Sequence, residues 1–435
     1  MTSELQYIEL YREASDLIKS KSCAVMNAVR DEAFEAFQRV GFPSKKVERY
    51  KYTDVDAAFA PNYGISLSPL EVKPSLYIYN IKDAPIDVTP YYHKIADTQD
   101  PITALNTALV HDALLIYVPK NQLVEDPIVV DNWFRGTAPT MMNRRILIVM
   151  ESGADAKIII NDRSLLPTFP KGKENHSGAL SLENKPDGNS SPLGEVGRGL
   201  LSTQVIEVFC HDNSHLDLYE IEDTTPLCSR FSNVYIHEGS DCSVKHNSIT
   251  LFNGQTRNLC DVYLRGEHSE VTLNGCAISS GSQQIDNNTL IRHEVPNCTS
   301  NELYKYVVDG QSVGAFAGKI LVEKDAQKTT SQETNANLCA SSDARMYTQP
   351  MLEIYADDVK CAHGSTVGVM DETALFYMRQ RGIPEAEARS LLKNAFMGQV
   401  IDQIKYEPLR QKLYVKVEKR FRGELEKCDD CKLCK

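Results

Sequence analysis

The sequence predicts a mainly β protein with helical segments at both ends. Between about residues 140 and 360, short alternating apolar runs recur between Gly, Asn and Asp residues, as in Ile146–Val149 and Lys157–Ile160. Long helical stripes are absent there, whereas apolar residues recur every three or four positions before residue 41 and after residue 370. Many short strands joined by close turns are typical of a β-sandwich, a β-barrel or a β-solenoid.

Residues 1–135 form a predicted N-terminal helical and mixed region. Apolar residues recur at helical spacing from Leu5 to Val40, and Gly41–Pro43 ends the pattern. The stretch that follows mixes helical patterns with short strand-like runs such as Leu114–Val118.

Residues 136–369 form the predicted β domain. The runs Val262–Leu264 and Val271–Leu273 begin nine residues apart, which suits two successive sides of a solenoid coil. Periodicity alone gives a solenoid and a sandwich equal weight. Residues from about 161 to 200 are rich in Pro, Gly, Asn and Ser, which predicts a long mobile surface loop, with partner binding as the alternative role.

Residues 370–427 form a predicted C-terminal helical domain. Asp371 suits a helix N-cap, Gly382 suits the end of that helix, and Pro384 suits the first turn of the next one. A third helix carries apolar residues at four-residue steps from Leu409 to Leu425. We expect this stripe to pack on its own domain, while part of it could bind a partner.

Composition limits the function classes. The chain has 435 residues, 42% hydrophobic and 24% charged, with a net charge of −12 that disfavours nucleic acid and anionic membranes as partners. The N-terminal residues do not resemble a signal peptide, and no apolar run is long enough for a transmembrane helix. The twelve cysteines are therefore expected to be free thiols in the cytoplasm.

No nucleotide-binding or hydrolase motif is present: the sequence lacks GxxxxGK[ST], GxSxG and HExxH. Cys361 and His363 are two residues apart, so on a strand they share one face. Such a pair suits a soft or borderline metal or an activated thiol, but the residues alone favour a packed cysteine beside a hydrogen-bonded histidine.

The C-terminal tail, residues 428–435, contains Cys428, Cys431 and Cys434. This C-x2-C-x2-C spacing fits three ligands of an iron–sulfur cluster or part of a zinc site. The aspartates between the first two cysteines raise thiol pKa values, and chain ends are commonly mobile, so metal binding and a plain solvent-exposed tail stay equally open.

Four segments resemble the SufB/SufD family of iron–sulfur cluster assembly proteins. The most specific is DDVKCAHGSTVGVMDETALFYMRQRGIPEAEARSLLKNAF at residues 357–396, which is similar to the C-terminal signature of the SufD type. VERYKYTDV at 47–55, and the segments 105–130 and 314–338, also agree. The resemblance covers residues from about 36 to 425 and excludes the predicted loop and the cysteine tail.

This resemblance implies a right-handed parallel β-helix and a non-catalytic scaffold subunit. It implies a heterodimer with SufB and docking of the ATPase SufC on the C-terminal helices. It also implies that His363 lies at the interface where a transient cluster forms against a SufB cysteine, whereas Cys361 could equally be a packed thiol. An isolated chain could pair with itself, and flavin binding stays open. Asp286 and His293 also lie in family-like surroundings, and a solenoid corner could bring them together.

Two rival functions make different demands on the sequence. A β-helix enzyme acting on polysaccharide would need clustered carboxylates or an Asp/Arg/Lys groove and is usually secreted. A SufB-like homodimeric scaffold would carry a cysteine shortly before the CAHGSTVG stretch, where this chain reads Glu353–Ala356. The SufD-type scaffold is therefore favoured.

Overall fold

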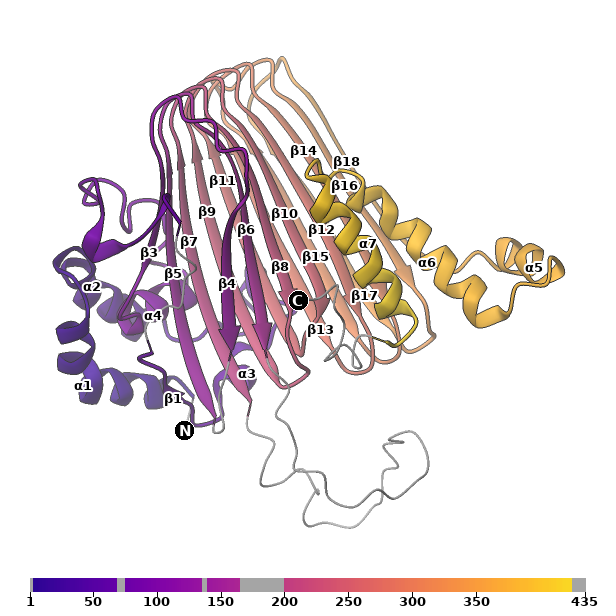
Figure 1. Cartoon of the computed structure of the whole chain (residues 1–435), viewed down its shortest axis with the longest axis horizontal. Helices are drawn as coiled ribbons and strands as arrows, with labels where there is room; N and C mark the ends of the chain where they lie inside the picture. The colour runs from indigo at the N-terminus through magenta and orange to yellow at the C-terminus, as the bar shows by residue number, and fades with distance from the viewer. Residues whose placement is uncertain (1–2, 69–74, 135–138, 165–198, 425–435) are drawn as a thin grey trace, which may run out of the picture.

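The structure of the chain is a computed structural model that describes residues 3–68, 75–134, 139–164 and 199–424. Its core is a parallel β-helix, in which eight successive coils each add one strand to each of two facing sheets (Figure 1). The predicted parallel β-helix is confirmed. The runs at 262 and 271 lie on opposite sides of one coil, as the solenoid interpretation requires.

The two sheets alternate along the chain. Sheet A consists of β1 (Gly64–Ile65), β2 (Ile78–Asn80), β3 (Leu114–Val118), β5 (Thr140–Met150), β7 (Leu200–Cys210), β9 (Cys228–Glu238), β11 (Gln255–Leu264), β13 (Gln284–His293), β15 (Val313–Val322) and β17 (Arg345–Ile354). Sheet B consists of β4 (Ile128–Phe134), β6 (Asp155–Ser164), β8 (His215–Asp223), β10 (Ser243–Phe252), β12 (Glu270–Ser279), β14 (Thr299–Val308), β16 (Thr330–Cys339) and β18 (Lys360–Val369). The strands pair in parallel, except that β2 is antiparallel to β3.

Stacked side chains hold the coils together. Residues in register on neighbouring coils point to the same side, so one aliphatic column runs through the interior of the solenoid. The members of this column are Ile116, Ile148, Val208, Ile236, Val262, Ile291 and Ile320. All are fully buried, and burial of such a side chain contributes about 1.5–3 kcal/mol.

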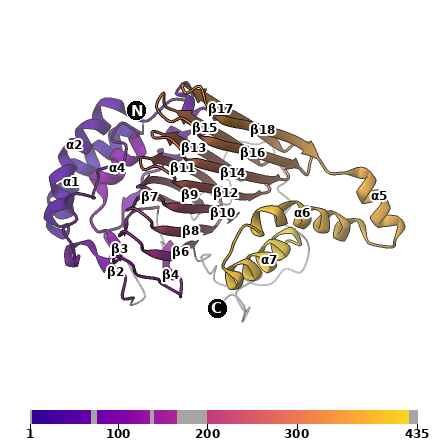
Figure 2. The ribbon, with the colours of Figure 1, turned by 90° about the horizontal axis from the view of Figure 1, so that it is seen from above.

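The N-terminal helices cover the outer face of the early part of sheet A (Figure 2). They are α1 (Glu4–Lys21), α2 (Ala24–Val40), α3 (Val55–Phe59) and α4 (Pro101–Leu109), with short 3-10 turns at Glu48–Tyr50 and Ile81–Asp83. Arg30 is fully buried and donates from Nη1 to the carbonyl oxygens of Ala108 at 2.6 Å and Val110 at 2.7 Å. It thereby satisfies the end of α4, which would otherwise bury unpaired carbonyls.

The C-terminal helices are α5 (Glu372–Gln380), α6 (Glu385–Ile401) and α7 (Glu407–Phe421). As predicted, Asp371 caps α5 by accepting from the backbone of Thr373 and Ala374, and Gly382 follows the helix with φ +84°. Helices α6 and α7 pack on the outer face of sheet B, whereas α5 projects away from the solenoid (Figures 1 and 2).

Three expectations change. The solenoid begins before residue 136, because β3 and β4 already pair with β5 and β6. The predicted loop at 161–200 begins later, because 161–164 belong to β6; residues 165–198 lie outside the described residues, as does the tail. The N-terminal apolar pattern belongs to two helices, and Leu5 is exposed. None of the described helices is long and apolar enough to cross a membrane.

Candidate functional site

The last coil of the solenoid ends in two uncovered strand edges. Within the described residues, β17 pairs only with β15 and β18 only with β16. Val367 and Val369 of β18 are exposed, Val369 by 77%. An uncovered strand edge presents unpaired backbone groups and favours pairing with another polypeptide.

His363 lies on this edge strand and is exposed. It is in register with Glu333 of β16, which in turn is in register with Glu302 of β14. Because in-register residues of parallel strands point to the same side, the His363 side chain lies on the side of β18 that faces the solenoid interior. It is accessible because no further coil follows it among the described residues.

The two glutamates behind His363 form an unusual buried pair. Glu333 is 0% exposed and Glu302 is 3% exposed. Glu302 accepts a hydrogen bond from Thr289 Oγ1 at 2.7 Å, but its second oxygen and both oxygens of Glu333 have no hydrogen-bond partner among the described residues. Gly318 leaves the necessary room, since a Cβ there would lie 2.4 Å from Glu333 Oε1.

Burial makes these carboxyls weak acids. Burial and the charge of Glu302 together raise the pKa of Glu333 to about 9, and burial raises the pKa of Glu302 to about 7. Glu333 is therefore protonated near neutral pH and can donate a hydrogen bond. Burial therefore favours the neutral form of these two carboxyls over a pair of negative charges next to His363.

Cys361 lies on the same face of β18 as His363, as the alternation of the strand predicts. Its side chain is half-buried and packs with Val359 against a small apolar cluster that includes Val322 and Ala356. Burial raises the pKa of the Cys361 thiol, which disfavours the reactive thiolate. The packed-thiol interpretation fits this environment better than an activated nucleophile.

The segment Val47–Val55, which we call the strap, crosses the outer face of sheet A and reaches the last coil. Arg49 pairs with Asp261 of β11 at 2.5 Å. Further along, the ring of Tyr52 stacks on that of Tyr347 in β17, with centroids 4.9 Å apart. Glu48 accepts a hydrogen bond from Gln349 of the same strand at 3.1 Å. The strap therefore fixes the outer face of the strand that ends sheet A.

Two family models match the chain. The model for the SufBD core domain of the SUF system for FeS cluster assembly matches residues 187–396, and the model for the SufBD N-terminal region matches residues 1–81 and 75–130. The chain belongs to the SufB/SufD family.

Individual proteins are similar to the chain over different shares of its length. An iron–sulfur cluster assembly SufBD family protein of Synechocystis is 27% identical over 348 residues, which cover 79% of this chain and 68% of that protein. The iron–sulfur cluster assembly protein SufD of Escherichia coli is 33% identical over 211 residues, covering 48% of this chain and 50% of SufD. The chloroplastic protein ABCI7 of Arabidopsis thaliana is 21% identical over 93% of this chain and 88% of its own length.

Two further residues considered from the sequence, Asp286 and His293, lie on β13 and not on the last coil. Asp286 and His293 lie on opposite faces of β13, so the structure does not bring them together. Asp286 accepts from Thr53 Oγ1 at 2.5 Å on the outer face. His293 is buried, lies 2.9 Å from Ser300 Oγ through Nε2, and has its pKa lowered to about 4 by burial, so it is a neutral interior residue.

The tail residues Cys428, Cys431 and Cys434 lie outside the described residues, so their metal site stays a prediction. Within the ranges that the structure describes, no three His, Cys, Asp or Glu side chains are grouped to hold a metal ion. Glu302 and Glu333 are the site residues that sequence reasoning missed. The sequence feature that could have revealed them is the recurrence of ionisable residues at 302, 333 and 363, which lie in register on successive coils.

Proposed function

We propose that this chain is a SufD-like, non-catalytic scaffold subunit of an iron–sulfur cluster assembly complex. The observation that carries the proposal is the position of His363, an exposed imidazole on an uncovered edge strand. A neutral imidazole can ligate iron near neutral pH, because its usual pKa is about 6.5. The nascent cluster is the cargo of the complex.

A SufB-like paralogue is the proposed partner at the last coil. His363 and Cys361 together supply at most two ligands, and the thiol is half-buried. A cluster at this edge therefore needs further ligands from a second chain, which the open edges of β17 and β18 could recruit by strand pairing. A homodimer would use the same edges when the paralogue is missing.

The C-terminal helices are the proposed docking site for a SufC-like ATPase. Phe376 and Tyr377 of α5 are 61% and 57% exposed, on a helix that projects away from the solenoid. Exposed aromatic side chains on one short helix are typical anchors of protein–protein interfaces. Because α6 and α7 are fixed to sheet B, movement of the ATPase would be transmitted to the solenoid.

The cytoplasm is the proposed location. The nine cysteines among the described residues form no disulfide bonds with one another, which suits a reducing compartment.

Co-expression with the SufB-like and SufC-like proteins of the same organism tests the function. We expect the three chains to co-purify and to build up a cluster that is visible by its absorbance. The His363→Ala variant should assemble the same complex, because an exposed side chain adds little packing, but its cluster yield should fall at least about tenfold.

The matched control is His215→Ala, which removes an exposed histidine at the start of β8, far from the last coil. The His215→Ala variant should assemble the three-chain complex and give the same cluster yield as wild type. A wild-type cluster yield in an intact His363→Ala complex would contradict the proposed role of His363, and failure of the three chains to associate would contradict the scaffold function.

A further inference from the structure

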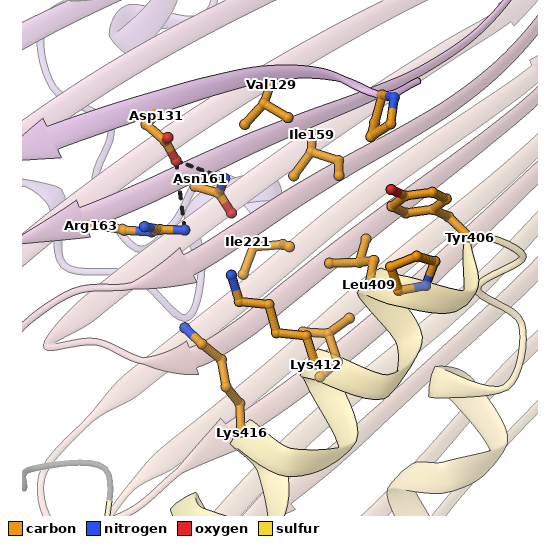
Figure 3. Close-up of a pocket in the computed structure, with 13 residues that line it drawn as sticks. Val129, Asp131, Ile159, Asn161, Arg163, Ile221, Tyr406, Leu409, Lys412 and Lys416 are labelled. Atoms are coloured by element: carbon orange, nitrogen blue, oxygen red, sulfur yellow. Dashed lines mark hydrogen bonds and ion pairs between the residues drawn. The ribbon is translucent and has the colours of Figure 1, made fainter. Parts of the chain in front are cut away.

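A pocket lies between the first coils and helix α7, on the outer face of sheet B (Figure 3). Its volume is about 280 Å³, which is close to the lower end of the range of about 300–1,000 Å³ for small-molecule sites. Strands β4, β6 and β8 form one side of the pocket and α7 forms the other. The candidate cluster site lies on β18 at the other end of sheet B, so the two sites are separate.

The sheet side of the pocket is formed by aliphatic side chains from three successive coils. They are Val129, Ile159 and Ile221, and Figure 3 shows them facing Leu409 of α7. The two isoleucines and Leu409 are buried and belong to one apolar cluster, and Val129 packs against it. Because covering such side chains removes apolar surface from water, the pocket favours a ligand with an apolar body.

The charged side chains that line the pocket already have partners. Arg163 lies 3.6 Å from Asp131, and Lys416 pairs with Asp223 at 2.5 Å. Lys412 has an interaction partner as well. A charged ligand would therefore enter a partly desolvated site without an unpaired ion of opposite sign among the described lining residues, which is unfavourable. The pocket thus favours an uncharged ligand.

Asn161 supplies one hydrogen-bond acceptor to the pocket. The residue is 8% exposed, and its Nδ2 donates to Asp131 at 2.9 Å. Its Oδ1 therefore points away from that carboxylate, and in Figure 3 this oxygen lies on the side of Ile221. Within the part of the chain that the structure describes, no group donates to Oδ1. A nearly buried acceptor without a donor is unfavourable, so a ligand that donates to it would be stabilised.

We propose that this pocket binds a small uncharged molecule with a short apolar body and one hydrogen-bond donor, such as an amide N–H or a hydroxyl. The body would lie between Val129, Ile159 and Leu409, and the donor would bond to Oδ1 of Asn161. Such a ligand contacts both sheet B and α7, so it would hold the C-terminal helices against the first coils. This inference does not depend on the proposed cluster function.

Calorimetric titration of the full chain with four probes of nearly the same shape tests the proposal. Benzamide is uncharged and donates, acetophenone is uncharged and cannot donate, benzoate is an anion and benzamidinium is a cation. We expect benzamide to bind saturably and one-to-one. Each of the other probes should bind at least about threefold more weakly, which is the effect of a single hydrogen bond. No saturable binding of benzamide, or binding of any other probe within about threefold of it, would overturn the proposal.

Two variants locate the binding. Asn161→Leu keeps the approximate shape of the side chain but removes the acceptor, so benzamide should bind only as weakly as acetophenone. Val129→Trp should fill the pocket and abolish binding of both probes. The matched control is Asn301→Leu, which makes the same change at an exposed position of β14 outside the pocket and should bind like wild type.

A preference for benzamide that persists in folded Asn161→Leu protein would refute the proposal. If Asn161→Leu does not fold, unchanged benzamide binding in Val129→Trp protein would refute it instead. The comparison of the four probes on the wild-type chain needs neither variant.

Discussion

At the scale of single residues, the buried pair Glu302 and Glu333 is the least expected feature of the last coil. A solenoid interior normally stacks apolar side chains, yet two carboxyls occupy one column directly behind His363. Their raised pKa values mean that the folded protein retains protons that the unfolded chain releases. Stability should therefore depend on pH in a definite direction.

The Glu333→Gln substitution measures this dependence. The pKa of Glu333 is raised from its ordinary value near 4.5 to about 9, so its protonated form contributes stability at low pH that is lost as the pH rises toward 9. The wild-type free energy of unfolding should fall by up to about 1.4 kcal/mol per pH unit for this proton. Glutamine stays neutral, so the variant should be more stable than wild type above about pH 8 in urea denaturation.

In the Glu333→Gln variant the free energy of unfolding should still decrease with pH, but less steeply than in wild type. The reason is that burial also raises the pKa of Glu302 and that of Glu222 to about 7. The control is Glu125→Gln, which neutralises an exposed carboxylate at the other end of the solenoid. Identical pH profiles of wild type and Glu333→Gln would show that Glu333 does not hold the proton.

The Cys361→Ser substitution separates packing from ligation. A half-buried thiol in an apolar cluster should lose about 1 kcal/mol of folding stability when a hydroxyl replaces it. Cluster yield per complex should change less than about twofold, because the proposed ligand is His363. A decrease in cluster yield as large as that expected for His363→Ala would show that the Cys361 thiol is also a ligand. Thermal unfolding and cluster absorbance give the two readouts.

The residues of the last coil were predictable only in part. The shared face of Cys361 and His363 follows from strand alternation alone. Glu333 was not predictable in this way, because its burial depends on Gly318, which lies on the opposite sheet. A contact between sheets has no signature in the local sequence.

At the scale of elements, helix caps were easier to predict than strands. Asp371 and Gly382 act through the backbone next to them, so their roles could be predicted locally. The strands that contain the apolar runs at 146–149, 157–160 and 262–264 are ten or eleven residues long, more than twice the length of those runs, because polar side chains also point inward. Buried Arg230, for example, pairs with Asp162 at 2.5 Å and with Glu220 at 3.0 Å inside the solenoid.

The strap should stabilise β17. Tyr52→Ala removes the ring that stacks on Tyr347, an interaction worth about 0.5–1.5 kcal/mol. Amide hydrogen exchange should therefore accelerate in β17 while β7 stays protected. Tyr117→Ala, on β3 at the other end of the solenoid, is the control and should leave β17 unchanged. If amide hydrogen exchange in β17 is equally slow in wild type, Tyr52→Ala and Tyr117→Ala, the strap does not stabilise β17.

Helix α5 should act in docking rather than in folding. Phe376→Asp places a charge on an exposed position, so the melting temperature should stay within about 2 °C of wild type. Affinity for the SufC-like ATPase should fall at least about tenfold, or about 1.4 kcal/mol. Leu123→Asp makes a similar change at an exposed leucine far from α5 and should bind normally. Retained affinity in Phe376→Asp would argue against α5 as the docking site.

At the scale of the whole molecule, each sheet of the solenoid has two terminal strands. Among the described residues, β2 and β4 end the sheets at the first coils and β17 and β18 end them at the last coil, where Val367 and Val369 of β18 are exposed. Isolated protein should therefore self-associate through the last coil at high concentration. Val367→Lys should shift the chain toward monomer in analytical ultracentrifugation, because a lysine on an edge strand opposes pairing. Unchanged self-association would place the contact elsewhere.

The strap also has a consequence for biosynthesis. Glu48 and Gln349, which it brings together, are separated by 301 positions in the chain. At about 5–20 residues per second, the N-terminal segment waits roughly 15–60 s on the ribosome before its contact strand has been translated. A truncated chain therefore never acquires the braced terminal strand, so nascent fragments lack the finished edge on which a partner subunit would assemble.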